Sequence, residues 1–276
     1  MEAAPDFDPV AFDAFERTNW ERAAPAYSSG FARLSVQTVE PLLDAVRAGL
    51  RTRLLDVGCG PGILTRRAVE RGCIVSGVDV AEPMLAIART SVPDAAFNQA
   101  DVQSGLPYAD ASFDAVAGNM VVHHLGQPPH AVAHCVRVLA PGGRLGLTMW
   151  DPPADNPAQG LFNEAAAAVG ASTPTGVPVL RERLDDAYFV ELFTVAGLTD
   201  VTVKHVRIEF RTDPDEWWDA VVSSTVLTAT LVQSQPPEIQ SRIRAAYDDL
   251  VQRYVDDSGN ARFPGSAMLA IGTRQS

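Results

Sequence analysis

The stretch Asp56-Val57-Gly58-Cys59-Gly60-Pro61-Gly62 decides the fold of this chain. It follows the apolar run 53–55 and precedes a helical pattern over 63–71. Three alternate glycines permit a tight strand-to-helix turn, because glycine has no Cβ and adopts positive φ readily. The backbone N–H groups at the start of the following helix then point toward whatever binds there. The stretch therefore predicts a nucleotide-like ligand at the end of a buried strand.

Short apolar segments rich in β-branched residues recur along the chain and alternate with helical patterns. This alternation is typical of a parallel sheet with helices on both faces and right-handed connections. The predicted fold class is α/β, a Rossmann-like doubly wound sheet. We expect strands at 53–57, 73–79, 95–100, 113–118, 143–150, 201–208 and 267–273, and helices from Asp8-Pro9 onward, over 31–48, near 158–169 and 185–196, and over 214–232 and 237–254.

The chain is expected to form one domain overall, since 276 residues suffice for one large core with added helices. Residues 1–50 form an N-terminal helical cap, and residues 51–150 form the cofactor-binding core. Residues 151–276 complete the sheet and carry helical lid insertions. The Pro- and Gly-containing segment 172–176 is a candidate substrate flap.

Composition excludes several classes of function. The chain has 22 basic and 34 acidic residues and a net charge of −12, the wrong sign for binding a phosphate backbone, so we expect no nucleic-acid partner. Its three cysteines show no paired spacing, which argues against disulfides and a metal site. Residues 1–6 do not resemble a signal peptide, and no apolar run has membrane-spanning length. We expect a cytoplasmic protein that has no membrane association.

The spacing of the glycines narrows the choice of ligand. The dinucleotide fingerprint G-x-G-x-x-G requires a third glycine where this chain has Ile63, which disfavours NAD. A phosphate-binding Walker loop would end in G-K-[ST], which is absent. Asp56 opens the loop and favours a cationic ligand. S-Adenosylmethionine, with its ammonium and sulfonium groups, meets this requirement.

Acidic residues at the ends of the next strands fit a nucleoside. Asp79 ends the second predicted strand, 23 residues beyond Asp56, where a carboxylate can accept hydrogen bonds from both ribose hydroxyls. Asp101 follows the third strand and can accept from the adenine amino group, while Val102 packs on the ring. Met84 can contact the other adenine face through its polarizable side chain.

Five motifs stand in the order found in one family. They are D-V-G-C-G-P-G at 56–62, V-D-V at 78–80, A-D-V at 100–102, F-D-A-V at 113–116 and L-A-P-G-G at 139–143. With them the chain resembles the small-molecule branch of the class I S-adenosylmethionine-dependent methyltransferases. The resemblance implies a seven-stranded sheet of order 3-2-1-4-5-7-6 with the last strand antiparallel. The expected cofactor is S-adenosylmethionine, with S-adenosylhomocysteine as product, bound by Asp56, Gly58, Gly60, Gly62, Asp79, Val80, Met84, Asp101, Val102 and Asn119.

The acceptor side is expected after the fourth strand, in the segment 119–125 at the topological switch point. The backbone near Asn119 should face the methionine part of the cofactor. Either His123 or His124 could remove a proton from the acceptor, since an imidazole titrates near neutral pH. His123 is the first choice, because the family position of His124 often anchors the loop. A base is not obligatory if positioning and desolvation supply the rate enhancement.

Aromatic residues outside the core are candidates for the acceptor wall. Trp20 and Tyr27 precede the sheet, in a segment that in this family often folds over the cofactor. Tyr188 and Trp217 lie in the expected lid. Ordinary packing is the alternative for all four side chains.

The predicted function is S-adenosylmethionine-dependent methyl transfer to a small-molecule acceptor, with oxygen favoured over carbon or nitrogen as the attacking atom. Specialised metabolism is implied by the resemblance alone. Two alternatives stay open: a cyclase or isomerase that binds the cofactor without using its methyl group, and a non-catalytic cofactor-binding protein. The sequence is compatible with a monomer or a homodimer.

Overall fold

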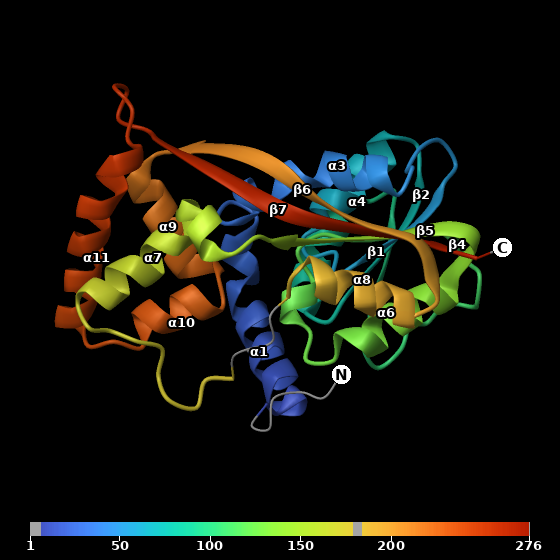
Figure 1. Cartoon of the computed structure of the whole chain (residues 1–276), viewed down its shortest axis with the longest axis horizontal. Helices are drawn as coiled ribbons and strands as arrows, with labels where there is room; N and C mark the ends of the chain where they lie inside the picture. Colours follow the sequence, from blue (N-terminus) through green and yellow to red (C-terminus); the bar gives the residue numbers. More distant parts are fainter. Residues whose placement is uncertain (1–6, 179–183, 276) are drawn as a thin grey trace.

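A seven-stranded sheet forms the centre of the computed structural model, which describes residues 7–178 and 184–275. The strand order is β3-β2-β1-β4-β5-β7-β6, with β7 antiparallel to both of its neighbours, and this confirms the predicted fold class (Figure 1). The strands are β1 (Arg53–Val57), β2 (Ile74–Asp79), β3 (Ala96–Gln99), β4 (Phe113–Gly118), β5 (Leu139–Trp150), β6 (Leu198–Thr212) and β7 (Ala261–Arg274).

Helices cover both faces of this sheet. They are α1 (Pro9–Tyr27), α2 (Ala32–Ser35), α3 (Val39–Ala45), α4 (Ile63–Glu70), α5 (Glu82–Ser91), α6 (Pro128–Val138), α7 (Pro157–Ala168), α8 (Asp186–Val195), α9 (Pro214–Ser224), α10 (Leu227–Gln233) and α11 (Pro237–Val251), with short 3₁₀ turns η1 (Val36–Thr38), η2 (Val122–His124), η3 (Pro153–Asp155) and η4 (Gln252–Tyr254). In Figure 1, α3 and α4 lie above the sheet and α6 and α8 below it.

The central strand β1 shows why both faces need cover. Its side chains alternate between the faces, so Leu54 packs with α3 and α4 whereas the next residue, Leu55, packs with α6 and α8. Both leucines are fully buried. A strand that is buried on both faces is rich in consecutive apolar residues, and this pattern is the basis on which a strand over 53–57 was predicted.

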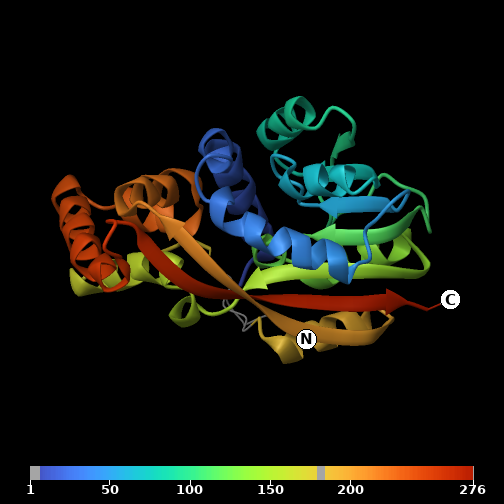
Figure 2. The same cartoon turned by 90° about the horizontal axis from the view of Figure 1, so that it is seen from above.

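The last two strands extend beyond the predicted ranges 201–208 and 267–273. Their outer halves continue as a two-stranded ribbon, in which Phe210 pairs with Phe263. Both phenylalanines are buried against α7, α9 and α11, which gather around the far end of the ribbon (Figure 2). The strands are longer because this helical group gives the outer ribbon a second buried face.

The cap departs from the single helix expected over 31–48. The segment forms α2, η1 and α3 in succession. Pro41 explains the break, because proline has no N–H and is tolerated only in the first turn of a helix. Starting α3 at Val39 places Pro41 in that first turn.

The helix α1 lies between the sheet and the outer helices, packing on α5 and α9 (Figure 2). No helix in 7–178 or 184–275 is both long and apolar enough to cross a membrane. Residues 1–6, where the expectation of no signal peptide was made, lie outside the described residues. The flap segment 172–176 forms no helix or strand.

Candidate functional site

A pocket of about 990 Å³, open solvent included, lies at the carboxyl edge of the parallel strands. The predicted residues that line it are Trp20, Tyr27, Gly58, Gly60, Asp79, Val80, Met84, Asp101, Val102, Asn119, His123 and His124. Lining residues that the sequence analysis did not single out include Asp13, Glu16, Arg17, Phe31, Gln103, Met120 and Trp150.

The glycine loop takes the backbone conformation expected from its sequence. Gly58, Gly60 and Gly62 have φ angles of 63°, 51° and 85°, a region that side chains with a Cβ rarely adopt. Asp79 holds the loop, because its Oδ2 accepts a 2.8 Å hydrogen bond from the Gly60 N–H and its Oδ1 accepts one of 2.9 Å from the Ala81 N–H. Burial raises the pKa of Asp79, and these backbone donors oppose the shift.

Gly62 contributes to the loop without lining the pocket. It begins α4, and a Cβ at this position would lie 3.3 Å from the Cβ of Ala88 in α5. The expectation that Gly62 contacts the cofactor is therefore corrected: its place is in the packing between α4 and α5.

The expectation that Asp56 binds the cofactor is also corrected. Asp56 shares a face of β1 with Leu54, so its carboxylate points under α4 and accepts a 2.6 Å hydrogen bond from the hydroxyl of Thr65. Asp56 is 1% exposed and does not line the pocket, and burial raises its pKa to about 7. A partly protonated carboxyl behind the loop does not provide the direct cation contact that the sequence suggested.

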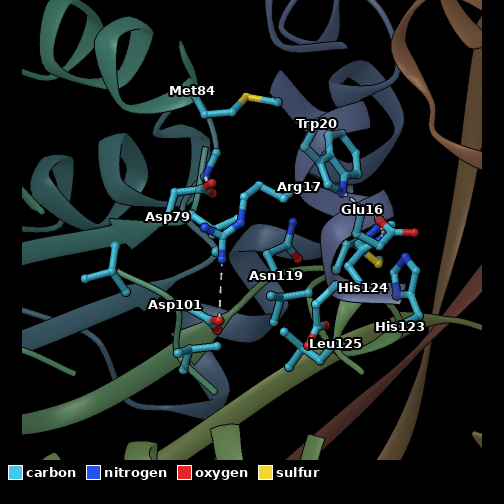
Figure 3. A pocket seen from close by; sticks show the side chains of 18 of the residues that line it. Glu16, Arg17, Trp20, Asp79, Met84, Asp101, Asn119, His123, His124 and Leu125 are labelled. Carbon is cyan, nitrogen blue, oxygen red and sulfur yellow. Dashed lines mark hydrogen bonds and ion pairs between the residues drawn. The ribbon is translucent and has the colours of Figure 1, made fainter. Parts of the chain in front are cut away.

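Asp101 faces the pocket and also organises its own turn. Its oxygens accept hydrogen bonds from the Gln103 N–H (2.9 Å) and the Ser104 hydroxyl (3.0 Å). The guanidinium of Arg17, from α1, lies 3.7 Å from the same carboxylate and crosses the region between Asp79 and Asp101 (Figure 3). Any ligand that reaches Asp101 must therefore share it with Arg17.

Asn119 is held rigidly where β4 ends. Its Oδ1 accepts hydrogen bonds of 2.7 Å from the hydroxyls of Thr38 and Thr148, and its Nδ2 donates to the Ser35 carbonyl at 3.1 Å. The next residue, Met120, has a φ of 58°. Such backbone strain in a residue other than glycine is concentrated at functional sites, and here it occurs at the topological switch point.

The two histidines of η2 have different surroundings. His123 is half-buried, and its buried Nδ1 has no hydrogen-bond partner among the described residues. Burial lowers the pKa of His123 well below its usual range, and the neighbouring His124 lowers it further. His124 has a 2.8 Å contact from its Nδ1 to Oε2 of Glu16 in α1 (Figure 3).

Two predicted acceptor residues lie away from the pocket. Tyr188 is 6% exposed and packs in the core between α8 and the sheet. Trp217 is fully buried among the outer helices, and its Nε1 donates to the Ala158 carbonyl at 2.7 Å. Both lie on the inner faces of amphipathic helices, so ordinary packing decides their positions. Trp217 stacks behind Phe31, which does line the pocket.

Some of the missed residues carried a usable signal in the sequence. Trp150 ends β5 at the same edge as the other strand-end residues, so its position could have been inferred. Glu16, Arg17 and Phe31 come from the cap, and nothing in their local sequence indicates which core residues they meet.

Comparison with known proteins agrees with this site. A family model described as a methyltransferase domain matches residues 55–147, which include the glycine loop, Asp79, Asp101 and both histidines of η2. The chain belongs to the class I S-adenosylmethionine-dependent methyltransferases.

Relatives of this methyltransferase include proteins of different named functions. It is 36% identical over 127 residues to a malonyl-[acyl-carrier protein] O-methyltransferase of Enterobacter lignolyticus, covering 46% of this chain and 50% of that protein. It is 28% identical to a demethylmenaquinone methyltransferase of Renibacterium salmoninarum, covering 60% of this chain and 74% of that protein. The chain thus spans about half the length of the first of these relatives.

A similar fold occurs in the solved structure of the YcgJ protein of Bacillus subtilis. The TM-score is 0.57 at 19% identity, with 87% of this chain and 98% of that chain covered. This likeness concerns the fold alone.

S-Adenosylmethionine fits the residues that the methyltransferase presents. A Cβ on Gly60 would meet no atom within 4 Å, so the loop leaves open space in front of its backbone. Asp79 and Asp101 line the pocket with carboxylate oxygens of the kind that would bind ribose and adenine, and Met84 and Val102 add apolar surface that would suit the adenine ring. When bound there, the cofactor supplies an electrophilic methyl group.

Proposed function

We propose that this methyltransferase transfers the methyl group of S-adenosylmethionine to a hydroxyl oxygen of a small aromatic or planar apolar acceptor. The observation that carries the proposal is the composition of the pocket at the carboxyl edge of the sheet. Acidic residues suited to a nucleoside, Asp79 and Asp101, lie on one side of it, and Trp20 lies with the histidine pair on the other (Figure 3). Such a pocket can bind a polar cofactor and an apolar acceptor next to each other.

The aromatic side chains of the pocket favour a planar acceptor. Trp20, Tyr27, Phe31 and Trp150 line the pocket, and Trp20 and Tyr27 meet edge to face with ring centroids 5.2 Å apart. Phe31 and Trp150 form a second such pair at 6.1 Å. Rings fixed by their own packing give a flat apolar ligand large contact area at little entropic cost. They also attract a sulfonium cation through their π-faces.

A hydroxyl acceptor is favoured by the histidines. An alcohol or phenol has to lose a proton during methylation, and a nearby imidazole can take it. Carbon or nitrogen acceptors are the other outcomes of the test. We further propose a role in specialised metabolism, because the aromatic side chains that line the pocket suit an apolar acceptor.

Cysteine usage and chain organisation enter the same proposal. The buried, unpaired cysteines Cys59, Cys73 and Cys135 suit a reducing cytoplasm. The parts 1–50, 51–150 and 151–276 work as one domain, because the first two line one pocket and the third adds β6 and β7 to the same sheet.

Isothermal titration with S-adenosylmethionine, S-adenosylhomocysteine and NAD tests the cofactor. Tight binding of the first two, and none of NAD, is the expected result. Incubation with methyl-labelled cofactor and a panel of phenols, amines and carbon acids then tests methyl transfer. Label on an oxygen of a phenol supports the proposal. Conversion of an acceptor with the cofactor left intact would instead identify a cyclase or isomerase, and binding without any conversion would identify a non-catalytic protein.

A further inference from the structure

Glu16 on α1 links the cap to a histidine of the pocket. Its Oε2 lies 2.8 Å from His124 Nδ1 and also accepts a 3.0 Å hydrogen bond from the indole N–H of Trp20. The indole ring of Trp20 packs edge to face on the His124 ring, with centroids 4.9 Å apart. Figure 3 shows Glu16 and Trp20 pointing from α1 toward His124, with His123 beside it.

The Glu16 carboxylate is 4% exposed and, within the described residues, has no arginine or lysine partner. A buried carboxylate is costly unless it is hydrogen-bonded, so the donors from Trp20 and His124 explain why it is tolerated. An ionised Glu16 requires the proton of the neutral His124 ring to be on Nδ1. The other ring nitrogen, Nε2, then carries a lone pair and can accept a proton.

His123 is the weaker of the two candidate bases, which reverses the order expected from the sequence. Its Nδ1 is buried without a hydrogen-bond partner, and no carboxylate contacts the ring within the described part of the chain. Protonating it would place an unpaired charge in an apolar site. His124 lines the pocket, its side chain is 24% exposed, and Glu16 lies beside it to stabilise the imidazolium.

We propose that His124 is the general base of the methyl transfer and that Glu16 is its positioning residue; this inference rests on the proposed function. The acceptor hydroxyl gives its proton to Nε2 of His124 while its oxygen forms a bond to the methyl carbon. The carbon–sulfur bond breaks and sulfur keeps the electron pair. The imidazolium later releases the proton to water. Charged or titratable groups that face His124 are Glu16 on α1, Asp79 on β2 and His123 on its own turn.

Because Glu16 belongs to α1, the base is complete only when the cap is docked. A separate contact also docks α1: Asp13 Oδ1 accepts from the Gln103 side chain at 3.0 Å and from the Gly126 N–H at 2.8 Å. Asp13 has no recorded contact with His124 among the described residues. Asp13→Asn is therefore a matched control that weakens cap docking without removing the partner of the base.

The first test needs no activity. Long-range ¹H–¹⁵N correlation spectra of the imidazole rings report the tautomer of each of the five histidines. We expect one ring, assigned as His124 by its loss in His124→Gln, to carry its proton on Nδ1. This signature should disappear in Glu16→Gln and persist in Asp13→Asn. An Nε2-protonated His124, or a tautomer unchanged in Glu16→Gln, overturns the proposal.

The second test is a pair of double-mutant cycles on kcat, run with an acceptor identified by the panel above. General-base catalysis contributes about 10²–10⁴-fold, so His124→Gln should lower kcat by at least about 100-fold. Glu16→Gln should lower kcat by about 10–100-fold, with little change in the KM of the acceptor or the affinity for S-adenosylhomocysteine. Combining the two should add almost nothing to the loss from His124→Gln, because residues that act as a unit are not additive.

The effects of Asp114→Asn, a change at the opposite edge of the sheet, and His124→Gln should multiply, because these residues act independently. Multiplicative loss in the Glu16–His124 cycle, or a change confined to KM, overturns the proposal although methyl transfer still occurs. If the wild type binds acceptors but methylates none of them, the proposed function is overturned. The tautomer measurement does not test that function and addresses only the contact between Glu16 and His124.

Discussion

The carboxylate of Asp79 accepts a 2.8 Å hydrogen bond from the backbone N–H of Gly60. This contact joins the end of β2 to the glycine loop that follows β1. Asp79 therefore shapes the loop before any ligand binds, in addition to facing the pocket itself. Changing either residue should affect both folding and cofactor binding, to different degrees.

Asp79→Ala should weaken S-adenosylhomocysteine binding by about 100-fold, because hydrogen bonds to charged groups contribute roughly 1.5–3 kcal/mol each. The folded state should also lose about 1–3 kcal/mol, since the N–H groups of Gly60 and Ala81 lose their acceptor. Titration calorimetry and urea unfolding measure the two effects. Asp114→Ala is the control, because Asp114 pairs with Arg53 at the opposite edge of the sheet. The affinity of this variant for S-adenosylhomocysteine should equal that of the wild type.

Comparing Gly58→Ala with Gly60→Ala distinguishes the steric strain of an added Cβ, measured as a loss of stability, from its effect on cofactor binding. Both positions have positive φ, which costs an alanine roughly 1–2 kcal/mol. A Cβ on Gly58 would also lie 2.5 Å from Cγ2 of Val121, whereas one on Gly60 meets nothing within 4 Å. Gly58→Ala should therefore unfold at a lower urea concentration than Gly60→Ala, and both should bind cofactor more weakly. Equal stability of the two variants would contradict this reading of the loop.

Phe31→Ala and Trp150→Ala should impair acceptor binding while leaving the nucleoside contacts unchanged. Both rings line the pocket and contact one another edge to face, and neither carries a group that could hydrogen-bond to ribose in place of Asp79. Removing one aromatic contact should raise the acceptor KM by about 5–10-fold, since such pairs contribute roughly 0.5–1.5 kcal/mol beyond area burial. Steady-state kinetics with saturating cofactor measure KM, and titration with S-adenosylhomocysteine is the control. A loss of cofactor affinity equal to the rise in KM would argue against a separate acceptor region.

Asp56→Asn should change the pH dependence of stability. Burial raises the pKa of Asp56 to about 7 in the folded protein, above its ordinary value of 3.8. The folded state therefore binds more protons than the unfolded state between about pH 4 and pH 7, and the wild type loses stability as pH rises through this interval. The variant has no such titrating carboxyl, so its free energy of unfolding relative to the wild type should be higher at pH 8 than at pH 5. The change between the two pH values should be on the order of a few kcal/mol.

Urea unfolding of both proteins at the two pH values measures the difference. Asp114→Asn is the control and should show the same change in stability at pH 5 and pH 8, because Arg53 lowers the pKa of Asp114 and this carboxyl is ionised in the folded and unfolded states at both pH values. An Asp56→Asn effect that is the same at pH 5 and pH 8 would show that this carboxyl stays ionised in the fold.

Local patterns predicted much of the site correctly. The glycine loop, Asp79 and Asp101 were placed at one edge of the sheet because parallel strands end at the same edge. Asp56 was misjudged because the alternation of side chains along β1 turns it toward α4, where Thr65 binds it. Trp217 was misjudged because an aromatic residue on an amphipathic helix has the same sequence pattern whether it faces a pocket or a core.

The sequence by itself determined the alternation of strands and helices, the glycine turn and the edge of the sheet at which the strand-end acids of this methyltransferase gather. These features depend on backbone conformations and strand-end chemistry that a few neighbouring residues specify. Only the tertiary structure decided that Glu16, 108 residues away in the chain, contacts His124 and not His123. The choice depends on how α1 docks across the carboxyl edge, and long-range packing of this kind leaves no periodic signal in the sequence of either segment.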